Sequence, residues 1–457
     1  MAPGARFRQA PPSSRPLPKL AAVPAAPRVW LTTLGCAKNQ VDSEKLLGRL
    51  AHAGFGAAAS PGEADVVMVN TCAFVEAARR ESVEAILEVA GRAPRARLVV
   101  LGCLAQRYQA ELAEALPEAD AVVPIEQYGE LVDRLAVLTG WEPAGPRREP
   151  RDILEEVRRP TPATPYAYLK VAEGCDKPCT FCAIPQFRGS QRSRRPAEVR
   201  AEAEELAAAG VGELVLVAQD LTGYGQDLGV PGGLADLVSL LADVPGLRRL
   251  RLLYLHPREV TDGLIAAMAD NPVVAPYFDL SLQHSSGRLL RAMRRPGDGE
   301  AHLGLIARIR AAAPEAALRS SFIVGFPGET EDDASELAGF LREARLDWGG
   351  FFPFSPEEGT VAANLPGQVP AEEAAERARH LEAIQEGITA ERSAAQVGKV
   401  VEVLVDLVEE GTAVGRSHRE APEIDGMILL DRGAAGEWHR ARITGSYGSD
   451  TVAEVVA

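Results

Sequence analysis

The sequence predicts an α/β protein with two β/α domains followed by a small all-β domain. Short apolar runs alternate with helical stretches from Val29 onward. A segment rich in Pro, Arg and Glu, from about Gly140 to Pro160, interrupts this alternation and is typical of a linker. From Lys399 to Ala457, Val- and Ile-rich runs separated by Gly predict a small β-barrel. The length of 457 residues, about three times that of a typical domain, accommodates this division.

The N-terminal region divides into an extension and a first domain. Residues 1–27 contain seven prolines and no Asp or Glu, so we expect a disordered extension there. Residues 28–145 follow a β-α pattern. Because each apolar run precedes helical sequence, we expect a Rossmann-like parallel sheet. Its expected strands are Val29–Leu34, Val66–Val69 and Leu98–Leu101.

A second β-α series occupies residues 160–392. Six apolar runs predict its strands: Tyr166–Val171, Glu213–Ala218, Leu250–Leu255, Tyr277–Leu282, Leu318–Val324 and Gly349–Phe354. Six parallel strands alternating with helices indicate a partial or full β/α barrel. Helical sequence from Ala371 to about Gln396 closes the series, and residues 395–457 form the expected β-barrel domain.

Composition narrows the class of protein. Hydrophobic residues make up 46% of the chain and charged residues 25%, as in soluble globular proteins. A formal net charge of -15 argues against a surface devoted to nucleic acid and favours a basic partner. Six cysteines are too few for a disulfide scaffold, and we find no apolar run of about 18 residues. We therefore expect a cytoplasmic protein, with no membrane partner, whose cysteines are ligands or nucleophiles.

Three cysteines form a C-x3-C-x2-C cluster directly after the first strand of the second series. They are Cys175, Cys179 and Cys182. Three thiolates on one short loop can hold three corners of an iron–sulfur cluster. The alternatives are a redox thiol group or a structural zinc site. Zinc would need a fourth ligand nearby, and the nearest histidine, His256, is distant in the sequence.

The other cysteines, Cys36, Cys72 and Cys103, each follow the end of a predicted strand, and one βα unit separates each from the next. Because consecutive parallel strands end at the same edge of a sheet, we expect these side chains to converge. Buried structural cysteines are the alternative. Gly35 and Gly102 would let the backbone approach a bulky cluster closely. Each triad offers three ligands to four irons, so one iron of each cluster should stay open.

These motifs resemble a known family. The second triad, with Phe181 before its last cysteine, resembles the radical S-adenosylmethionine signature. The N-terminal triad, the barrel and a C-terminal TRAM domain together resemble the methylthiotransferases, and the resemblance extends from Arg28 to Ala457. The matching segments are Leu34–Glu44, Ala172–Gly189, Gly325–Thr330 and Glu357–Thr360.

Two branches of this family differ in substrate: one modifies an adenosine of transfer RNA, the other an aspartate of the small-subunit ribosomal protein numbered twelve. Lys38–Glu44, Ala218–Asp220 and Ala421–Gly426 resemble the ribosomal-protein branch, although Glu420, Ser281 and Ser285–Ser286 depart from its pattern. Residues 396–457 contain 11 acidic and 6 basic residues, which would repel phosphate and attract a basic protein. The transfer-RNA enzyme is the alternative within the family, and a non-catalytic iron–sulfur sensor is the alternative outside it.

The resemblance implies two [4Fe-4S] clusters and S-adenosylmethionine as cosubstrate. The cluster on Cys175, Cys179 and Cys182 would take an electron from an external donor and cleave S-adenosylmethionine. The resulting radical would take a hydrogen from the β-carbon of the aspartate. The cluster on the N-terminal triad would hold the sulfur, which a second S-adenosylmethionine would methylate before it is delivered as the methylthio group. A sulfur donor would replace it.

Further site residues also follow from the resemblance. No catalytic residue beyond the cluster ligands is expected. Expected cofactor contacts are Phe181, Gln283, Gly325, Gly328 and Glu329, and expected substrate contacts are Arg416, Glu423 and Asp425. His284 could bind cofactor or substrate, or make a structural hydrogen bond. The basic stretch could contact a cofactor carboxylate or ribosomal RNA, or be a solvated charge run; it comprises Arg188, Arg192, Arg194 and Arg195.

Overall fold

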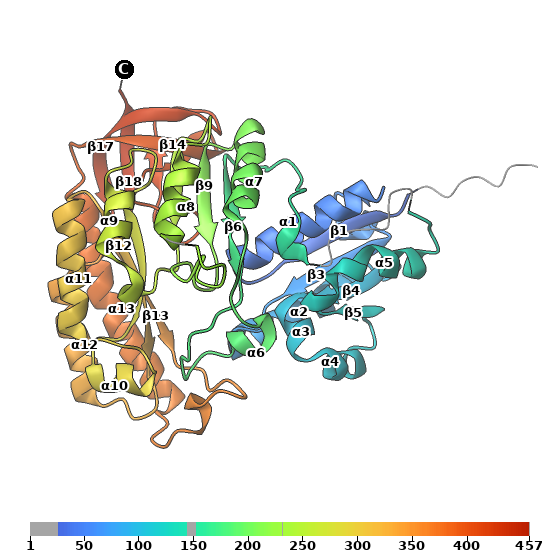
Figure 1. Cartoon of the computed structure of the whole chain (residues 1–457), viewed down its shortest axis with the longest axis horizontal. Helices are drawn as coiled ribbons and strands as arrows, with labels where there is room; N and C mark the ends of the chain where they lie inside the picture. Colours follow the sequence, from blue (N-terminus) through green and yellow to red (C-terminus); the bar gives the residue numbers. More distant parts are fainter. Residues whose placement is uncertain (1–25, 144–151, 231, 457) are drawn as a thin grey trace, which may run out of the picture.

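A computed structural model describes residues 26–143, 152–230 and 232–456. These residues form a parallel-sheet domain, a partial β/α barrel and a small closed β-barrel, which is the expected fold class (Figure 1). The predicted extension lies outside the described residues, except for its last two positions. No helix in the described part of the chain is long and apolar enough to cross a membrane.

The N-terminal domain is a five-stranded parallel sheet with helices on both faces. Its strand order is β2-β1-β3-β4-β5. The strands are β1 (Arg28–Thr33), β2 (Gly56–Ala57), β3 (Val66–Thr71), β4 (Arg97–Leu101) and β5 (Ala121–Val123). The helices are α1 (Ala37–His52), α2 (Glu76–Arg92), α3 (Gly102–Arg107), α4 (Gln109–Ala115) and α5 (Leu131–Thr139). The three predicted strands are β1, β3 and β4; the edge strands β2 and β5 are too short to leave an apolar run.

The central β/α barrel contains all six predicted strands. These are β6 (Tyr166–Lys170), β9 (Glu213–Val217), β10 (Arg249–Leu252), β11 (Tyr277–Gln283), β12 (Ala317–Val324) and β13 (Trp348–Pro353). They form two parallel sheets, β6-β9-β10 and β11-β12-β13. The bridges Leu250–Val274 and Leu255–Leu280 connect the two sheets. The barrel is therefore partial.

Helices cover the outer face of this barrel (Figure 1). They are α7 (Pro196–Ala208), α8 (Gly233–Ala242), α9 (Asp262–Ala269), α10 (Gly287–Ala292), α11 (Gly299–Ala312), α12 (Glu331–Ala344) and α13 (Ala371–Ala394). The largest apolar core lies between these helices and the strands. A second apolar cluster contains Tyr168, Val215 and Tyr277, whose side chains line the inside of the barrel, and it also includes Val41 of α1. The first domain therefore packs against the barrel lining.

The loop after β6 carries three short elements. They are β7 (Ala172–Glu173), α6 (Ile184–Arg188) and β8 (Arg192–Ser193). β7 and β8 pair antiparallel, so the C-x3-C-x2-C segment between them begins and ends next to one short ladder. Because this loop starts where β6 ends, it lies at the end of the barrel where ligands of β/α folds bind.

The C-terminal domain closes the opposite end of the central barrel. Its strands, in the order β14-β15-β16-β18-β17, form a closed barrel. They are β14 (Val400–Glu409), β15 (Thr412–Arg416), β16 (Ile428–Leu430), β17 (Trp438–Tyr447) and β18 (Asp450–Val455). The hydroxyls of Tyr166 and Tyr277, at the starts of β6 and β11, donate to Glu423 (2.8 Å) and Asp425 (2.6 Å). These contacts fix the C-terminal domain on the side where the barrel strands begin.

Candidate active site

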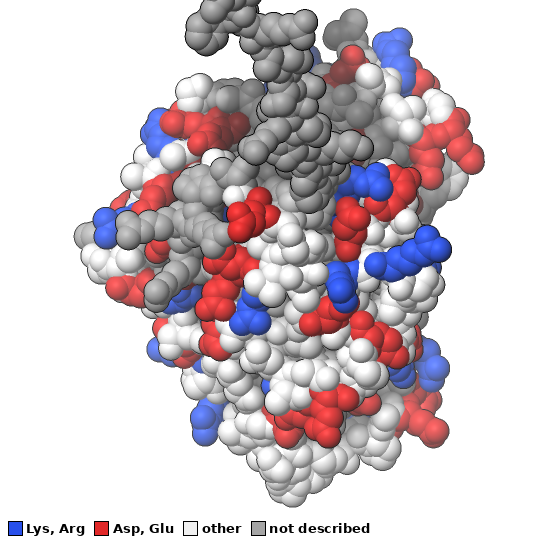
Figure 2. All heavy atoms as spheres, turned by 90° about the vertical axis from the view of Figure 1, so that its right-hand side faces the viewer, with Lys and Arg blue, Asp and Glu red and all other residues white. Residues whose placement is uncertain are grey.

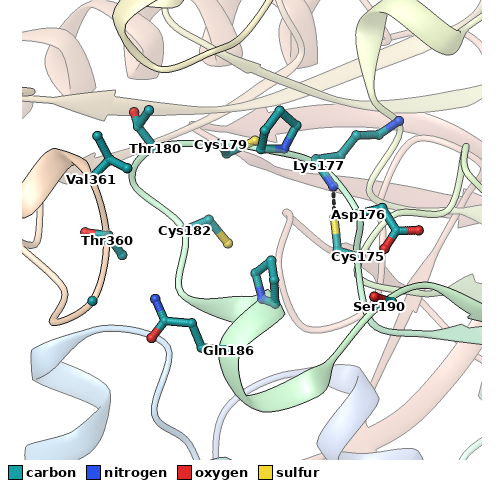
Figure 3. A pocket seen from close by; sticks show the side chains of 13 residues that line it. Cys175, Asp176, Lys177, Cys179, Thr180, Cys182, Gln186, Ser190, Thr360 and Val361 are labelled. Atoms are coloured by element: carbon teal, nitrogen blue, oxygen red, sulfur yellow. Dashed lines mark hydrogen bonds between the residues drawn. The ribbon is translucent and has the colours of Figure 1, made fainter.

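The cysteines of the C-x3-C-x2-C segment line a cavity of about 370 Å³ (Figure 3). Cys175, Cys179 and Cys182 follow one curve of the loop, and the sulfur of Cys182 points into the cavity. Gly359 and Thr360, which follow β13, form part of the facing wall. The barrel therefore brings a segment almost 180 residues further along the chain to the cysteine loop.

Burial and hydrogen-bond donors determine the chemistry of this triad. Burial raises the pKa of Cys175 to about 11 and the pKa of Cys182 to about 12. The backbone N–H of Lys177 points at the Cys175 sulfur (3.4 Å), and the Arg295 guanidinium lies 3.7 Å from the Cys179 sulfur. These groups favour thiolates once a metal displaces the protons. Three sulfur donors with an open side fit an iron–sulfur cluster that keeps one iron free.

The three N-terminal cysteines come together at one edge of their sheet. Cys36 directly precedes α1, Cys72 follows β3, and Cys103 lies in the first turn of α3. Cys36 and Cys103 both affect the pKa of Cys72, which burial raises to about 12. In the residues that the structure describes, neither triad is drawn together tightly enough to hold a single metal ion. The fit of the N-terminal triad to a cluster therefore rests on the proximity of its three thiols, two of which act on the pKa of the third.

Two glycines make this convergence possible. Gly35 (φ +91°) and Gly102 (φ +92°) adopt the left-handed conformation that glycine favours. A Cβ atom on Gly35 would lie 2.9 Å from the Cys72 sulfur, and one on Gly102 would lie 2.4 Å from the Thr71 carbonyl oxygen. Any side chain at these positions would force the strand-end loops apart.

Buried polar side chains that sequence reasoning missed hold these loops together. The Asn39 amide donates to the carbonyls of Leu34 (3.0 Å) and Thr71 (2.9 Å), which joins the ends of β1 and β3. The Ser82 hydroxyl accepts the backbone N–H of Cys72 and donates to its carbonyl, each at 3.0 Å. The signal in the sequence was a polar residue, Asn39 or Ser82, at a helix position that faces the sheet. The spacing of the sequence does not indicate which groups these two side chains bind.

Arg188 links the two triads. It ends α6, six residues after Cys182, yet its guanidinium donates to the sulfur of Cys103 at 3.1 Å and 3.3 Å. It also pairs with Asp42 of α1 (2.9 Å) and Glu173 of β7 (3.1 Å). Burial still raises the pKa of Cys103, and the guanidinium opposes that shift from within the barrel domain, so it favours a thiolate there once a metal displaces the proton.

The expected basic stretch accordingly divides into buried and exposed parts. Arg188 and Arg194 are buried, and Arg194 pairs with Glu202. Arg192 and Arg195 are exposed. The stretch is neither one solvated charge run nor one binding surface, because its alternate members point into the interface between the two domains.

The residues expected at the cofactor lie around the ends of β11 and β12. Gln283 ends β11 with φ +72°, and Gly325, with φ +75°, follows β12. The Glu329 carboxylate accepts the backbone N–H groups of Gly325 (2.7 Å) and Phe326 (3.3 Å) and pairs with Arg377. Glu329 therefore fixes its own loop.

Three more residues complete this neighbourhood. The Gly328 N–H donates to the Gly367 carbonyl (2.7 Å), and Phe181 packs on the apolar cluster that contains Phe326. His284 is fully buried, and burial lowers its pKa to about 4, so its ring is neutral. Its Nδ1 accepts the Ser286 N–H, whereas its Nε2 has no hydrogen-bond partner among the described residues.

The residues expected at the substrate lie elsewhere. Arg416 is buried and pairs with Asp406 (2.6 Å) and Glu213 (3.0 Å). Glu423 and Asp425 accept hydrogen bonds from the tyrosines at the strand starts, as described above. The structure thus places all three at the end of the barrel away from the cysteines. Each of the three has polar partners within the chain, and their expected contact with substrate stays a prediction.

Three family models match the chain in the order of its domains. Residues 28–124 match "Uncharacterized protein family UPF0004", residues 169–341 match the radical SAM superfamily, and residues 397–456 match the TRAM domain. The radical SAM match extends from within β6 to within α12 and so includes the three cysteines that line the cavity. The UPF0004 match contains the N-terminal triad.

Full-length relatives agree with these matches. The chain is 45% identical to a "Ribosomal protein uS12 methylthiotransferase RimO" of Saccharopolyspora erythraea, over 94% of this chain and 95% of the relative. It is 47% identical to the Moorella thermoacetica protein of the same name, over 92% and 97%. The fold is similar to that of TsrM, a radical S-adenosylmethionine methyltransferase from Kitasatospora setae (TM-score 0.54, 17% identity, 74% of this chain and 77% of that one). The chain belongs to the radical S-adenosylmethionine methylthiotransferase family, in the branch of the uS12 methylthiotransferases.

Proposed function

We propose that this protein attaches a methylthio group to the β-carbon of an aspartate in ribosomal protein uS12, in the space between its two cysteine triads. The observation that carries the proposal is Arg188, which belongs to the C-x3-C-x2-C loop and binds the sulfur of Cys103. This contact brings the segment that follows the barrel triad against the N-terminal triad at the interface between the two domains. The names of the full-length relatives supply the substrate.

We infer a separate cluster for each triad. Membership of the radical SAM superfamily implies S-adenosylmethionine and one [4Fe-4S] cluster, for which Cys175, Cys179 and Cys182 are the ligands we propose. A second [4Fe-4S] cluster on Cys36, Cys72 and Cys103 is our proposal from the donor set and its convergence. When bound, these groups supply a radical that can attack an inert C–H bond and the sulfur that replaces the hydrogen.

Ion pairs between the N-terminal domain and the barrel hold the two triads in fixed positions relative to each other. Arg188, Asp42, Glu173 and Lys170 form one buried ion-pair network between α1 and the barrel. Beside it, Arg107 of α3 pairs at 2.9 Å with Glu357, which follows β13. Buried charges that are fully paired define one geometry, since removing any partner leaves another charge unpaired in a low dielectric. We propose that this network sets the distance between the two triads.

The remaining expected residues keep a role beside the barrel triad. Glu329 and its partner Arg377 fix the backbone at Gly325 and Gly328, which would lie against the adenosyl part of S-adenosylmethionine. Phe181 and Gln283 would contact the same cosubstrate from the cysteine loop and from β11. Arg295, which contacts the Cys179 sulfur, lacks a carboxylate partner among the described residues and suits the carboxylate of S-adenosylmethionine.

Surface charge supports a basic protein partner. On the face formed by the N-terminal domain, acidic patches alternate with basic side chains, and the described residues in this view form no continuous basic surface (Figure 2). Together with the net charge of -15, this distribution favours binding of a basic ribosomal protein over a nucleic-acid backbone. We further propose domains at residues 28–145, 160–392 and 395–457, a cytoplasmic location, and external donors of electrons and sulfur.

Mass spectrometry of uS12 tests the proposed function. Purified uS12 is incubated without oxygen with the reconstituted protein, a reductant and S-adenosylmethionine, then analysed intact and as peptides. We expect a mass gain of one methylthio group on one aspartate. The matched control is uS12 incubated with the Cys72→Ala variant, which should stay unmodified. A methylthio group on an adenosine of transfer RNA, with uS12 unchanged, would show that the protein catalyses methylthio transfer but that uS12 is not its substrate.

A further inference from the structure

His284 is a buried histidine with a fixed tautomer. It directly follows β11, and its side chain is fully buried. Because the backbone N–H of Ser286 can only donate, its 2.9 Å bond to Nδ1 makes Nδ1 an acceptor. Burial lowers the pKa of the ring to about 4, so the neutral ring carries its hydrogen on Nε2. Among the described residues, Nε2 has no hydrogen-bond partner. A buried donor without an acceptor is unfavourable, which indicates a role beyond folding.

The Glu329 carboxylate lies close to this nitrogen. Its Oε2 atom is 3.8 Å from Nε2 of His284, which is near enough for an electrostatic contact but too far for a hydrogen bond. The same Oε2 accepts the backbone N–H groups of Gly325 and Phe326, and Oε1 pairs with Arg377 at 3.2 Å. A movement of about 1 Å would therefore give His284 a buried, charged acceptor.

Other side chains already join the segment after β11 to the segment after β12. The Ser286 hydroxyl donates to the Asp333 carboxylate at 2.7 Å, and the Arg288 guanidinium donates to the Gly328 carbonyl at 2.9 Å. A bond between His284 and Glu329 would add a further link. It would act directly at the strand ends, because His284 is the first residue after β11 and Glu329 holds the first residue after β12.

Both segments border the barrel triad. The backbone N–H of Thr180, in the cysteine loop, donates to the carbonyl of Met293 at 3.1 Å, directly after α10. Phe181 packs on the apolar cluster that contains Phe326, in the segment after β12. Gln283, an expected cofactor contact, ends β11 immediately before the histidine. A link between the two segments would therefore fix the backbone on two sides of the expected cofactor site.

We propose that His284 is a positioning residue, whose Nε2–H donates to Glu329 when S-adenosylmethionine binds and so joins the two segments beside the cosubstrate. This inference rests on the proposed function, which supplies the ligand. His284 does not contact the reacting atoms in this account. It acts through Glu329 on the backbone at Gly325, and through the chain on Gln283. A hydrogen bond to a buried carboxylate is a strong single contact, so its formation adds to the affinity for S-adenosylmethionine.

Two substitutions separate the roles of the ring nitrogens. His284→Asn places an amide oxygen near the position of Nδ1 and removes the donor at Nε2, whereas His284→Gln places an amide N–H near the position of Nε2. Binding of S-adenosylmethionine is measured by isothermal titration calorimetry on the anaerobically reconstituted full chain, without reductant and without uS12. His284→Asn should weaken binding about 10- to 100-fold, and His284→Gln should retain most of the affinity. A role through Ser286 alone would give the opposite order.

A second comparison tests the route through Glu329. In a Glu329→Gln background the charged acceptor is gone, so His284→Asn should weaken binding much less than it does in the unchanged protein. Equal losses in the two backgrounds would overturn the inference. So would a His284→Gln variant that binds as weakly as His284→Asn, or a His284→Asn variant that binds as tightly as the unchanged protein. Because uS12 is absent from the titration, failure to modify uS12 would overturn the proposed function and leave this result standing.

Discussion

The two cysteine triads supply similar sets of sulfur ligands, but the fold brings the cysteines of each triad together in a different way. The barrel triad lies on one loop beside an open cavity, and its three cysteines are all partly exposed. The N-terminal triad comes from three separate βα units, and Cys72 and Cys103 are buried. One triad depends on local spacing, whereas the other depends on the sheet that aligns three strand ends. Changes at the two should therefore have different consequences.

Charge separates the triads further. In the barrel triad, burial raises the pKa values of Cys175 and Cys182 and holds both thiols protonated in the metal-free protein. At Cys36 burial acts in the same direction, but the Lys38 ammonium, the Asn39 N–H and the Arg188 guanidinium outweigh it and lower the pKa below its usual value. These cations favour a thiolate at Cys36, whereas burial still raises the pKa values of Cys72 and Cys103.

The largest effect is expected at the barrel triad. Cys179→Ala removes one of the three proposed ligands of the cluster that activates S-adenosylmethionine, so reductive cleavage should fall to background. The measurement is chromatography of 5′-deoxyadenosine after addition of a strong reductant under anaerobic conditions. Cleavage at the rate of the unchanged protein would show that the triads are assigned to the wrong roles.

A change at the other triad should separate two steps of the reaction. Cys72→Ala removes a proposed ligand of the second cluster but leaves the barrel cavity intact, so cleavage of S-adenosylmethionine should continue while methylthio transfer stops. Both products are quantified in one reaction, by chromatography and by mass spectrometry of uS12. Transfer at an undiminished rate would exclude the N-terminal triad as the sulfur site.

These assignments also show what could be predicted from the sequence. The six barrel strands and the convergence of Cys36, Cys72 and Cys103 were predictable, because βα topology fixes where each strand ends. The role of Arg188 was not, because its partners Asp42 and Cys103 are 146 and 85 residues away. Nor could Arg416 be placed: the sequence does not reveal that the C-terminal domain docks at the starts of the barrel strands.

Stability provides the next test, at the contact that joins the triads. Arg188→Met leaves Asp42 and Glu173 with one fewer cation in a buried network, and should lower the free energy of unfolding by about 3 to 5 kcal/mol. Arg192→Met is the matched control, because Arg192 lies four residues further on, is exposed and pairs with Asp152 at the surface. Its expected cost is below about 1 kcal/mol. Urea unfolding measures both, and equal losses would contradict a buried role for Arg188.

The smallest effect is a difference in thiol reactivity within the N-terminal triad. The pKa of Cys36 is lowered, whereas that of Cys72 is raised to about 12, so Cys36 carries much more thiolate at pH 8. In metal-free protein, iodoacetamide should therefore label Cys36 at least about tenfold faster than Cys72. Raising the pH from 8 to 10 should increase the rate at Cys72 more than at Cys36. Peptide mass spectrometry over time follows both sites, and equal rates would contradict the charge asymmetry.

The central claim is that the two triads hold two separate clusters, and the iron content tests it most directly. Iron and acid-labile sulfide are measured in the reconstituted protein, in a variant with Cys36, Cys72 and Cys103 changed to Ala, and in one with Cys175, Cys179 and Cys182 changed to Ala. We expect each triple variant to retain half the iron and half the sulfide of the unchanged protein. A variant that keeps the full content, or loses all of it, would contradict the account.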